Sequence, residues 1–142
     1  MPALSPRLMA IVDALPLRPG MRVLEIGCGP GAMAREIAAR IGDGHVLAVD
    51  RSATAVKQAE AGCAAEIAAG RMSVRRSAAE DFALLPGEAP YDLAVAVRVG
   101  AFDGRFPAAG EKARPRLRAA LVPGGRLYTD GGDPLREFPL SD

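Results

Sequence analysis

The chain has 142 residues, which suits one domain, and we expect residues 1–142 to form a single unit. Its 18 basic and 17 acidic side chains leave a net charge of +1, which argues against nucleic acid or an anionic membrane surface as a partner. Two cysteines, one histidine and no apolar run of ~20 residues argue against a disulfide framework, a metal cluster and a membrane helix.

The first predicted element is an amphipathic helix over residues 4–15. Ser5 is suited to cap it, Pro6 suits its first turn, and one apolar stripe follows: Leu8, Ile11, Val12 and Leu15. Residues 1–10 lack the basic-then-apolar pattern of a secretory signal, which makes the cytoplasm the expected location by default.

Two strand-then-helix units follow. An apolar run at residues 23–26 leads into a glycine-rich turn, and a helical stripe at Met33, Ile37 and Ile41 comes directly after it. A second apolar run at residues 46–49 ends at Asp50. Ser52 is placed to cap the next helix, which we expect to run to Gly70.

The second half of the chain is less regular. We expect strands at residues 72–76, 91–99 and 126–129, and a helix near residues 108–121. The sequence Pro-Gly-Gly at residues 123–125 predicts a turn, and the glycines, prolines and charges of residues 131–142 predict a tail or loop.

Apolar strands that alternate with helices predict an α/β fold. We expect a three-layer open sheet, mostly parallel, with about five strands and a Rossmann-like architecture. Ligands of such sheets bind beyond the carboxyl ends of the strands, near the first crossover.

The glycine-rich turn Val-Leu-Glu-Ile-Gly-Cys-Gly-Pro-Gly, residues 23–31, is the most informative segment. Its glycines permit positive φ and let a ligand lie against the backbone, beside the positive end of the following helix. Asp50 closes the next strand, where a carboxylate can accept both hydroxyls of a ribose. Together these features predict a ligand that contains a nucleoside.

Two cofactor classes fit this pattern. Gly27, Gly29 and Ala32 satisfy the dinucleotide fingerprint formally, so an NAD-binding domain remains an alternative. Glu25 and Pro30 favour the other class, because a carboxylate suits a cationic amino group and proline lacks an N–H for a pyrophosphate. The turn resembles motif I of the class I S-adenosylmethionine-dependent methyltransferases.

Four further segments are similar to that family, in the family's order: residues 45–52, 77–82, 91–99 and 121–128. The family often has an acidic residue beside the adenine where this chain has Ala78, so Ala79 or Glu80 would take that place. The resemblance and the residue pattern together predict S-adenosylmethionine as the cofactor and these binding residues: Glu25, Gly27, Cys28, Gly29, Gly31, Asp50, Arg51, Ala79, Glu80 and Arg98.

The expected activity is methyl transfer to an acceptor, with a small molecule as the default. A non-catalytic module that binds the cofactor, serving as a partner subunit, is the second hypothesis. No catalytic residue is assigned, and the carboxylates worth testing as a base are Asp103, Asp130 and Asp133. Cys28 at a helix start could be a nucleophile, but no paired base is visible.

The chain resembles a short form of the family that lacks the usual last strands. About thirteen residues follow Thr129, so we expect the strand that ends there to be an exposed edge. Such an edge favours association. Either a second subunit pairs with it, or the tail covers it, or the chain is a shortened product, and our hypothesis is a homodimer that covers this side.

Overall fold

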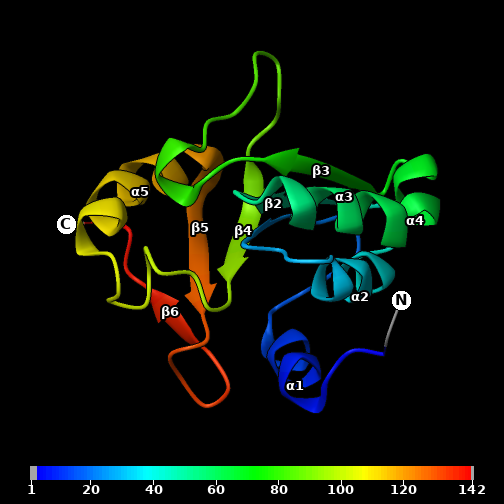
Figure 1. The fold of residues 1–142 in the computed structure, drawn as a ribbon, viewed down its shortest axis with the longest axis horizontal. Helices are drawn as coiled ribbons and strands as arrows, with labels where there is room; N and C mark the ends of the chain where they lie inside the picture. The colour runs from blue at the N-terminus through cyan, green and yellow to red at the C-terminus, as the bar shows by residue number, and fades with distance from the viewer. Residues whose placement is uncertain (1–2, 142) are drawn as a thin grey trace.

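The computed structural model describes residues 3–141, which form one six-stranded sheet with helices on both faces (Figure 1). The strand order is β3-β2-β1-β4-β5-β6, in which the first five strands are parallel and β6 is antiparallel to β5. The elements are α1 (Pro6–Ala14), β1 (Arg22–Ile26), α2 (Ala32–Arg40), β2 (His45–Asp50), α3 (Ala53–Gly62), α4 (Ala64–Ala68), β3 (Met72–Arg76), the 3₁₀ turn η1 (Ala79–Asp81), β4 (Tyr91–Ala96), α5 (Pro107–Ala120), β5 (Leu121–Thr129) and β6 (Arg136–Phe138). The predicted α/β fold is confirmed, with six strands where about five were expected.

Alternate residues of the central strands point to opposite faces of the sheet, and each face has its own core. Helices α1, α2 and α3 pack on one face, against side chains that include Val23, Val46 and Val95. Helix α5 and η1 pack on the other, against side chains that include Leu24 and Ala94. Burial on both faces explains why these strands are continuously apolar.

The expected helix caps are present. The Ser5 hydroxyl accepts the Leu8 N–H at 3.3 Å, and the Ser52 hydroxyl accepts the Ala55 N–H at 3.2 Å. The helix predicted from Ser52 to Gly70 is divided into α3 and α4 at Cys63. Gly62, which has low helix propensity, ends α3 at this break.

Two strand boundaries differ from the prediction. Strand β4 ends at Ala96 instead of Val99, because the chain turns sharply at Arg98, whose φ is +57°. Strand β5 begins at Leu121, so the expected turn at residues 123–125 lies within the strand, where the pairing with β4 is irregular.

The prediction that residues 131–142 contain only tail or loop is wrong. Residues 136–138 form β6, which pairs with residues 127–129 of β5. The Phe138 ring packs edge-on against Phe102, with 5.2 Å between the ring centroids, and this tertiary contact holds the short strand on the sheet. The sequence had suggested that β5 would be an exposed edge. Over residues 127–129 this is wrong, because β6 covers β5 there.

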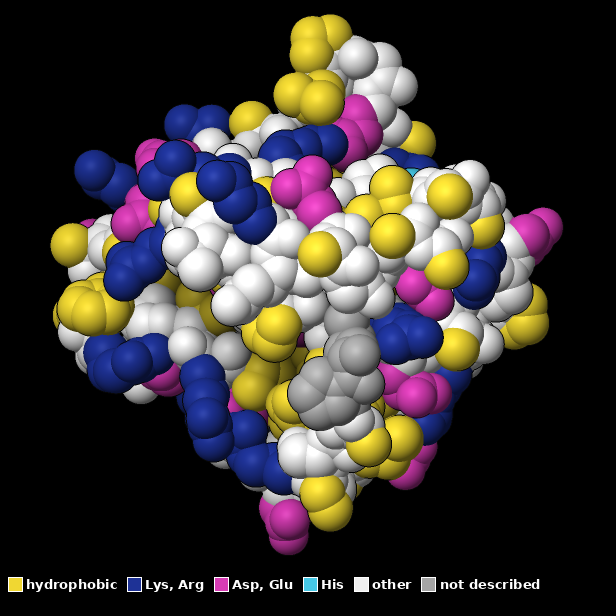
Figure 2. All heavy atoms as spheres, turned by 45° about the vertical axis from the view of Figure 1, so that its right-hand side comes forward, with side chains coloured by type: hydrophobic (Ala, Val, Ile, Leu, Met, Phe, Trp, Pro, Cys, Tyr) yellow, Lys and Arg dark blue, Asp and Glu magenta, His cyan; other side chains and the backbone are white. Residues whose placement is uncertain are grey.

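The surface in Figure 2 carries acidic and basic side chains interspersed with one another, in keeping with the net charge of +1. None of the helices within residues 3–141 is long and apolar enough to span a bilayer.

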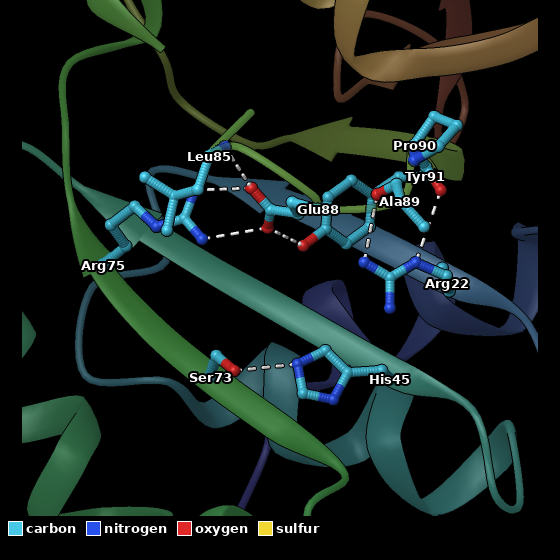
Figure 3. Close-up of polar contacts among 9 residues, drawn as sticks. All are labelled: Arg22, His45, Ser73, Arg75, Leu85, Glu88, Ala89, Pro90 and Tyr91. Carbon is cyan, nitrogen blue, oxygen red and sulfur yellow. Dashed lines mark hydrogen bonds and ion pairs between the residues drawn. The ribbon is translucent and has the colours of Figure 1, made fainter. Parts of the chain in front are cut away.

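The loop of residues 82–90 projects from the sheet (Figure 1) and is fastened at its base by Glu88 (Figure 3). The Glu88 carboxylate accepts two hydrogen bonds from the Arg75 guanidinium, at 3.2 and 2.9 Å, and one from the Tyr91 hydroxyl at 2.6 Å. It also accepts the Leu85 N–H at 2.8 Å. Burial alone would raise the pKa of Glu88, but these hydrogen bonds outweigh it and lower the pKa to about 2.

Replacing Glu88 with glutamine is therefore expected to destabilise the fold by about 2 to 3 kcal/mol at pH 7. Because the pKa is lowered on folding from its usual 4.5, the stabilisation is present above pH 4.5 and is lost as the pH falls toward 2. Urea unfolding of both proteins at pH 7 and pH 2.5 measures this difference. An equal difference at the two pH values would contradict it.

Candidate functional site

Strand β1 runs into a loop whose three glycines all have positive φ: +75° at Gly27, +54° at Gly29 and +93° at Gly31. A Cβ at Gly27 would lie 2.7 Å from Val99, and one at Gly31 would lie 3.0 Å from the Cys63 sulfur. These two glycines let the loop pack against its neighbours. Around a Cβ at Gly29 there is nothing within 4 Å, so the backbone there faces open space.

The N–H groups of this loop already have acceptors inside the protein. Gly27 and Cys28 donate to the Val49 carbonyl oxygen at 2.7 and 2.9 Å, Gly29 donates to Asp50 Oδ2 at 2.9 Å, and Gly31 donates to the Cys28 carbonyl oxygen at 3.1 Å. Pro30 has no N–H to offer. A pyrophosphate would therefore find no unengaged N–H group within residues 27–31, which disfavours the dinucleotide alternative.

Asp50 stands beside the loop at the end of β2, as predicted. Its Oδ2 accepts the Gly29 N–H, and its Oδ1 accepts the Ser52 N–H at 2.9 Å. Each carboxylate oxygen retains acceptor capacity for a hydroxyl group of a ligand. The hydrogen bonds from the Gly29 and Ser52 N–H groups fix the orientation of the Asp50 carboxylate.

Glu25 lies in β1 two residues before the loop and is only 3% exposed. Within residues 3–141 its Oε1 has no hydrogen-bond partner. Burial is the main cause that raises the pKa of Glu25 to about 8, and the nearby Asp50 charge adds to the shift. A buried carboxyl oxygen without a partner fits a ligand that brings a cationic group.

A cavity of about 450 Å³ opens at the carboxyl ends of β1, β2 and β4, where the fold predicts a ligand. Its wall includes six of the predicted cofactor residues: Gly27, Asp50, Arg51, Ala79, Glu80 and Arg98. The other four, Glu25, Cys28, Gly29 and Gly31, lie in β1 and the loop but not on the cavity wall.

Other wall residues were not predicted as part of the site. They are Ile26, Ser77, Ala78, Val99, Gly100, Ala101, Arg105, Phe106 and Ala109. Most of them come from the segment after β4, where the Phe106 ring packs against Gly100. The aromatic and charged residues of that segment were visible in the sequence, but no spacing indicated which of them would face the cavity.

The acidic residues considered as a base are largely engaged. Asp103 pairs with Arg105 at 2.9 Å, which lowers the pKa of Asp103. Asp130 pairs with Arg7 at 2.7 Å and also accepts the Arg98 N–H. Asp133 is exposed and is not part of the cavity wall.

Cys28 is also unsuited to nucleophilic chemistry. It is buried, and burial raises the pKa of its thiol, with the Glu25 and Asp50 charges adding to the shift. A thiol held in its neutral form is a poor nucleophile.

The chain is similar in sequence to known methyltransferases. A family model described as a methyltransferase domain matches residues 23–125. A protein-L-isoaspartate O-methyltransferase of Methylorubrum populi is 35% identical over 131 residues, which are 92% of this chain and 54% of that protein. Nocamycin O-methyltransferase of Saccharothrix syringae is 34% identical over 137 residues, 94% of this chain and 46% of that protein. The chain thus spans about half the length of the curated relatives it matches.

The fold is similar to a solved structure as well. A SAM-dependent methyltransferase from Thiobacillus denitrificans, in complex with S-adenosyl-L-homocysteine, superposes with a TM-score of 0.69 and 25% identity. The match covers 91% of this chain and 49% of the other. By its sequence match and its fold, the chain belongs to the methyltransferase-domain family, and the predicted resemblance to the class I S-adenosylmethionine-dependent methyltransferases is confirmed.

Proposed function

We propose that the chain binds S-adenosylmethionine and transfers its methyl group to a small-molecule acceptor. The observation that carries the proposal is the pairing of two carboxyl groups around the glycine loop. Asp50 on the cavity wall offers acceptors for a ribose. Glu25 is buried in β1 and is not on the wall, and its unpartnered oxygen suits an ammonium group, directly or through a bound water. S-adenosylmethionine carries both a ribose and an ammonium group. A dinucleotide has an anionic pyrophosphate in place of the ammonium group, which a carboxylate would repel.

In this proposal the cofactor extends along the carboxyl ends of β1 and β2. Gly27 lies on the cavity wall, and the rest of the loop, Cys28, Gly29 and Gly31, continues from it beside the methionine portion. Arg51, Ala79 and Glu80 border the adenine, since they come from the ends of β2 and β3 on the side of Asp50. Arg98, which was predicted among the cofactor residues, lies on the other side of the loop, after β4, and we place it instead toward the acceptor.

The bound cofactor supplies a methyl group already activated by the sulfonium. The protein's task is to hold the acceptor in line with that methyl group and to exclude water. Phe106 and Val99 give the cavity an apolar wall on the β4 side. An acceptor that is an amine or a readily ionised oxygen needs little assistance from a base.

A non-catalytic module that binds the cofactor is the second candidate. The engagement of Asp103 and Asp130 by arginines favours it, because neither carboxylate is placed as an unencumbered base. Turnover of S-adenosylmethionine to S-adenosylhomocysteine with a panel of amine, phenol and carboxylate acceptors separates the two candidates. Cofactor binding without any turnover would favour the module.

The proposed function is tested by calorimetric titration of the chain with S-adenosylhomocysteine and, separately, with NADH. We expect saturable binding of S-adenosylhomocysteine and none of NADH. Binding of NADH alone would restore the dinucleotide alternative, and binding of neither would contradict the proposal.

A homodimer and a cytoplasmic location remain predictions. Because β6 covers the end of β5, a dimer would form through β6 or through the remaining edge of β5. Light scattering at micromolar concentration measures the mass in solution, and a monomer there would contradict the dimer.

A further inference from the structure

Arg98 has an unusual backbone conformation at the edge of the cavity. Within residues 3–141 it is the one non-glycine residue with a positive φ, at +57°. Such a conformation is disfavoured for a residue with a Cβ and persists only where its surroundings hold it. Strained residues of this kind cluster at ligand sites.

Two side chains hold the backbone of Arg98. Its N–H donates to Asp130 Oδ1 at 3.3 Å, and its carbonyl oxygen accepts from the Arg105 guanidinium at 2.9 Å. Each of these groups is fixed in turn: Asp130 by Arg7, and Arg105 by Asp103. This chain of contacts sets the point from which the Arg98 side chain leaves the backbone.

The Arg98 guanidinium itself is uncommitted. Arg98 lines the cavity, yet in the described part of the chain its guanidinium makes no hydrogen bond, ion pair or contact with an aromatic ring. Since the strand order is β2-β1-β4, Arg98 lies across the glycine loop from Asp50. The exposed Arg98 therefore stands on the β4 side of the cavity wall, away from Asp50.

We infer that Arg98 binds an oxyanionic group, a carboxylate or a phosphate, on the methyl acceptor. This inference rests on the proposed function, because it takes the Asp50 side of the cavity to be filled by the cofactor. A planar guanidinium pairs with either oxyanion through two parallel N–H donors. Binding of this oxyanionic group orients the acceptor. The group is distinct from the atom that receives the methyl group.

The test uses the chain saturated with S-adenosylhomocysteine and titrated with inorganic phosphate, then acetate, at constant ionic strength. Chemical shifts of the backbone N–H signals of Gly100 and Ala101, which line the same cavity and are present in every variant, report binding. We expect saturable shifts whose apparent Kd rises at least tenfold in Arg98→Gln. The Kd should not change in Arg116→Gln, which replaces an exposed arginine on α5 outside the cavity. A response to phosphate alone or to acetate alone identifies the preferred oxyanion, and either supports the inference.

A second variant separates the side chain from the fold. Arg98→Gly suits the positive φ, so it should match the wild-type melting temperature while losing the phosphate or acetate response. An equal response in wild type and both variants, or none in the wild type, overturns the inference. An affinity for S-adenosylhomocysteine that falls tenfold in both variants also overturns it, because Arg98 would then serve the cofactor.

The cofactor titration of the wild-type chain shows whether the proposed function itself fails, independently of the Arg98 variants. If the wild-type chain does not bind S-adenosylhomocysteine, the same oxyanion titrations are run on the ligand-free chain. A response there that depends on Arg98 supports an anion site in the absence of the proposed cofactor, and no response overturns both ideas.

Discussion

Replacing Asp50 with alanine is expected to weaken the binding of S-adenosylhomocysteine at least a hundredfold. Hydrogen bonds to a charged group contribute about 1.5 to 3 kcal/mol each, so the loss of two ribose contacts alone accounts for this factor. The variant also loses the acceptor that holds the Gly29 N–H, and with it the shape of the glycine loop. Calorimetric titration at pH 8 measures the change.

Two further variants sharpen this experiment. Asp50→Asn keeps one side-chain oxygen as an acceptor, so its affinity should lie between those of the wild type and Asp50→Ala. Asp43→Ala removes an exposed carboxylate near the opposite end of β2 and should bind like the wild type. If Asp50→Ala bound within threefold of the wild type, Asp50 would have no role in holding the ribose.

Replacing Glu25 with glutamine is expected to change how stability depends on pH. The pKa of Glu25 rises on folding from 4.5 to about 8, so the folded chain holds this proton more tightly than the unfolded chain. Its contribution is fully present below pH 4.5 and is lost as the pH rises to 8, at about 1.4 kcal/mol per pH unit. Glutamine has no such proton, so Glu25→Gln should gain stability relative to the wild type as the pH rises, which urea unfolding at pH 5 and pH 8 measures.

The same proton links Glu25 to the cofactor. An ammonium group beside Glu25 favours the carboxylate, so binding should release a proton near neutral pH. The affinity of the wild type for S-adenosylhomocysteine should therefore rise up to tenfold per pH unit between pH 6 and pH 8. Titration in two buffers with different ionisation enthalpies counts the protons released.

Glu25→Gln is also the control for this linkage. Its affinity should be at least tenfold weaker than that of the wild type at pH 8, and it should not vary between pH 6 and pH 8. A wild-type affinity that is flat over this interval would show that the ammonium group lies elsewhere.

Local signals predicted much of the fold. Strand β1, the glycine loop and α2 were predicted closely, because the positive φ of Gly27 and Gly31 is a local requirement that glycine in the sequence makes visible. Strand β6 was missed, since three residues among glycines and prolines carry no periodic pattern. It forms because Phe138 meets Phe102, a contact between residues distant in the chain.

The residues of the site that lie in or next to a strand were predictable, and those placed by tertiary contacts were not. Asp50 and Glu25 could be placed because each follows from its position in a buried strand, and the structure brings both close to the glycine loop. The positive φ of Arg98 could not be predicted, since it depends on Asp130 and Arg105, which come from two other segments. Phe106 reaches the cavity by packing on Gly100, which again is a matter of tertiary structure.

The pairing of β1 with β4 has a consequence for the order of folding. Val23 of the central strand pairs with Leu93, so the sheet closes around the glycine loop only after a long stretch of chain has been synthesised and ordered. A cofactor that recognises the closed sheet binds the folded state alone, and free ligand at a hundred times its Kd would add about 2.7 kcal/mol to the stability of that state. The supply of cofactor would then help to set how much of this chain is folded at any moment.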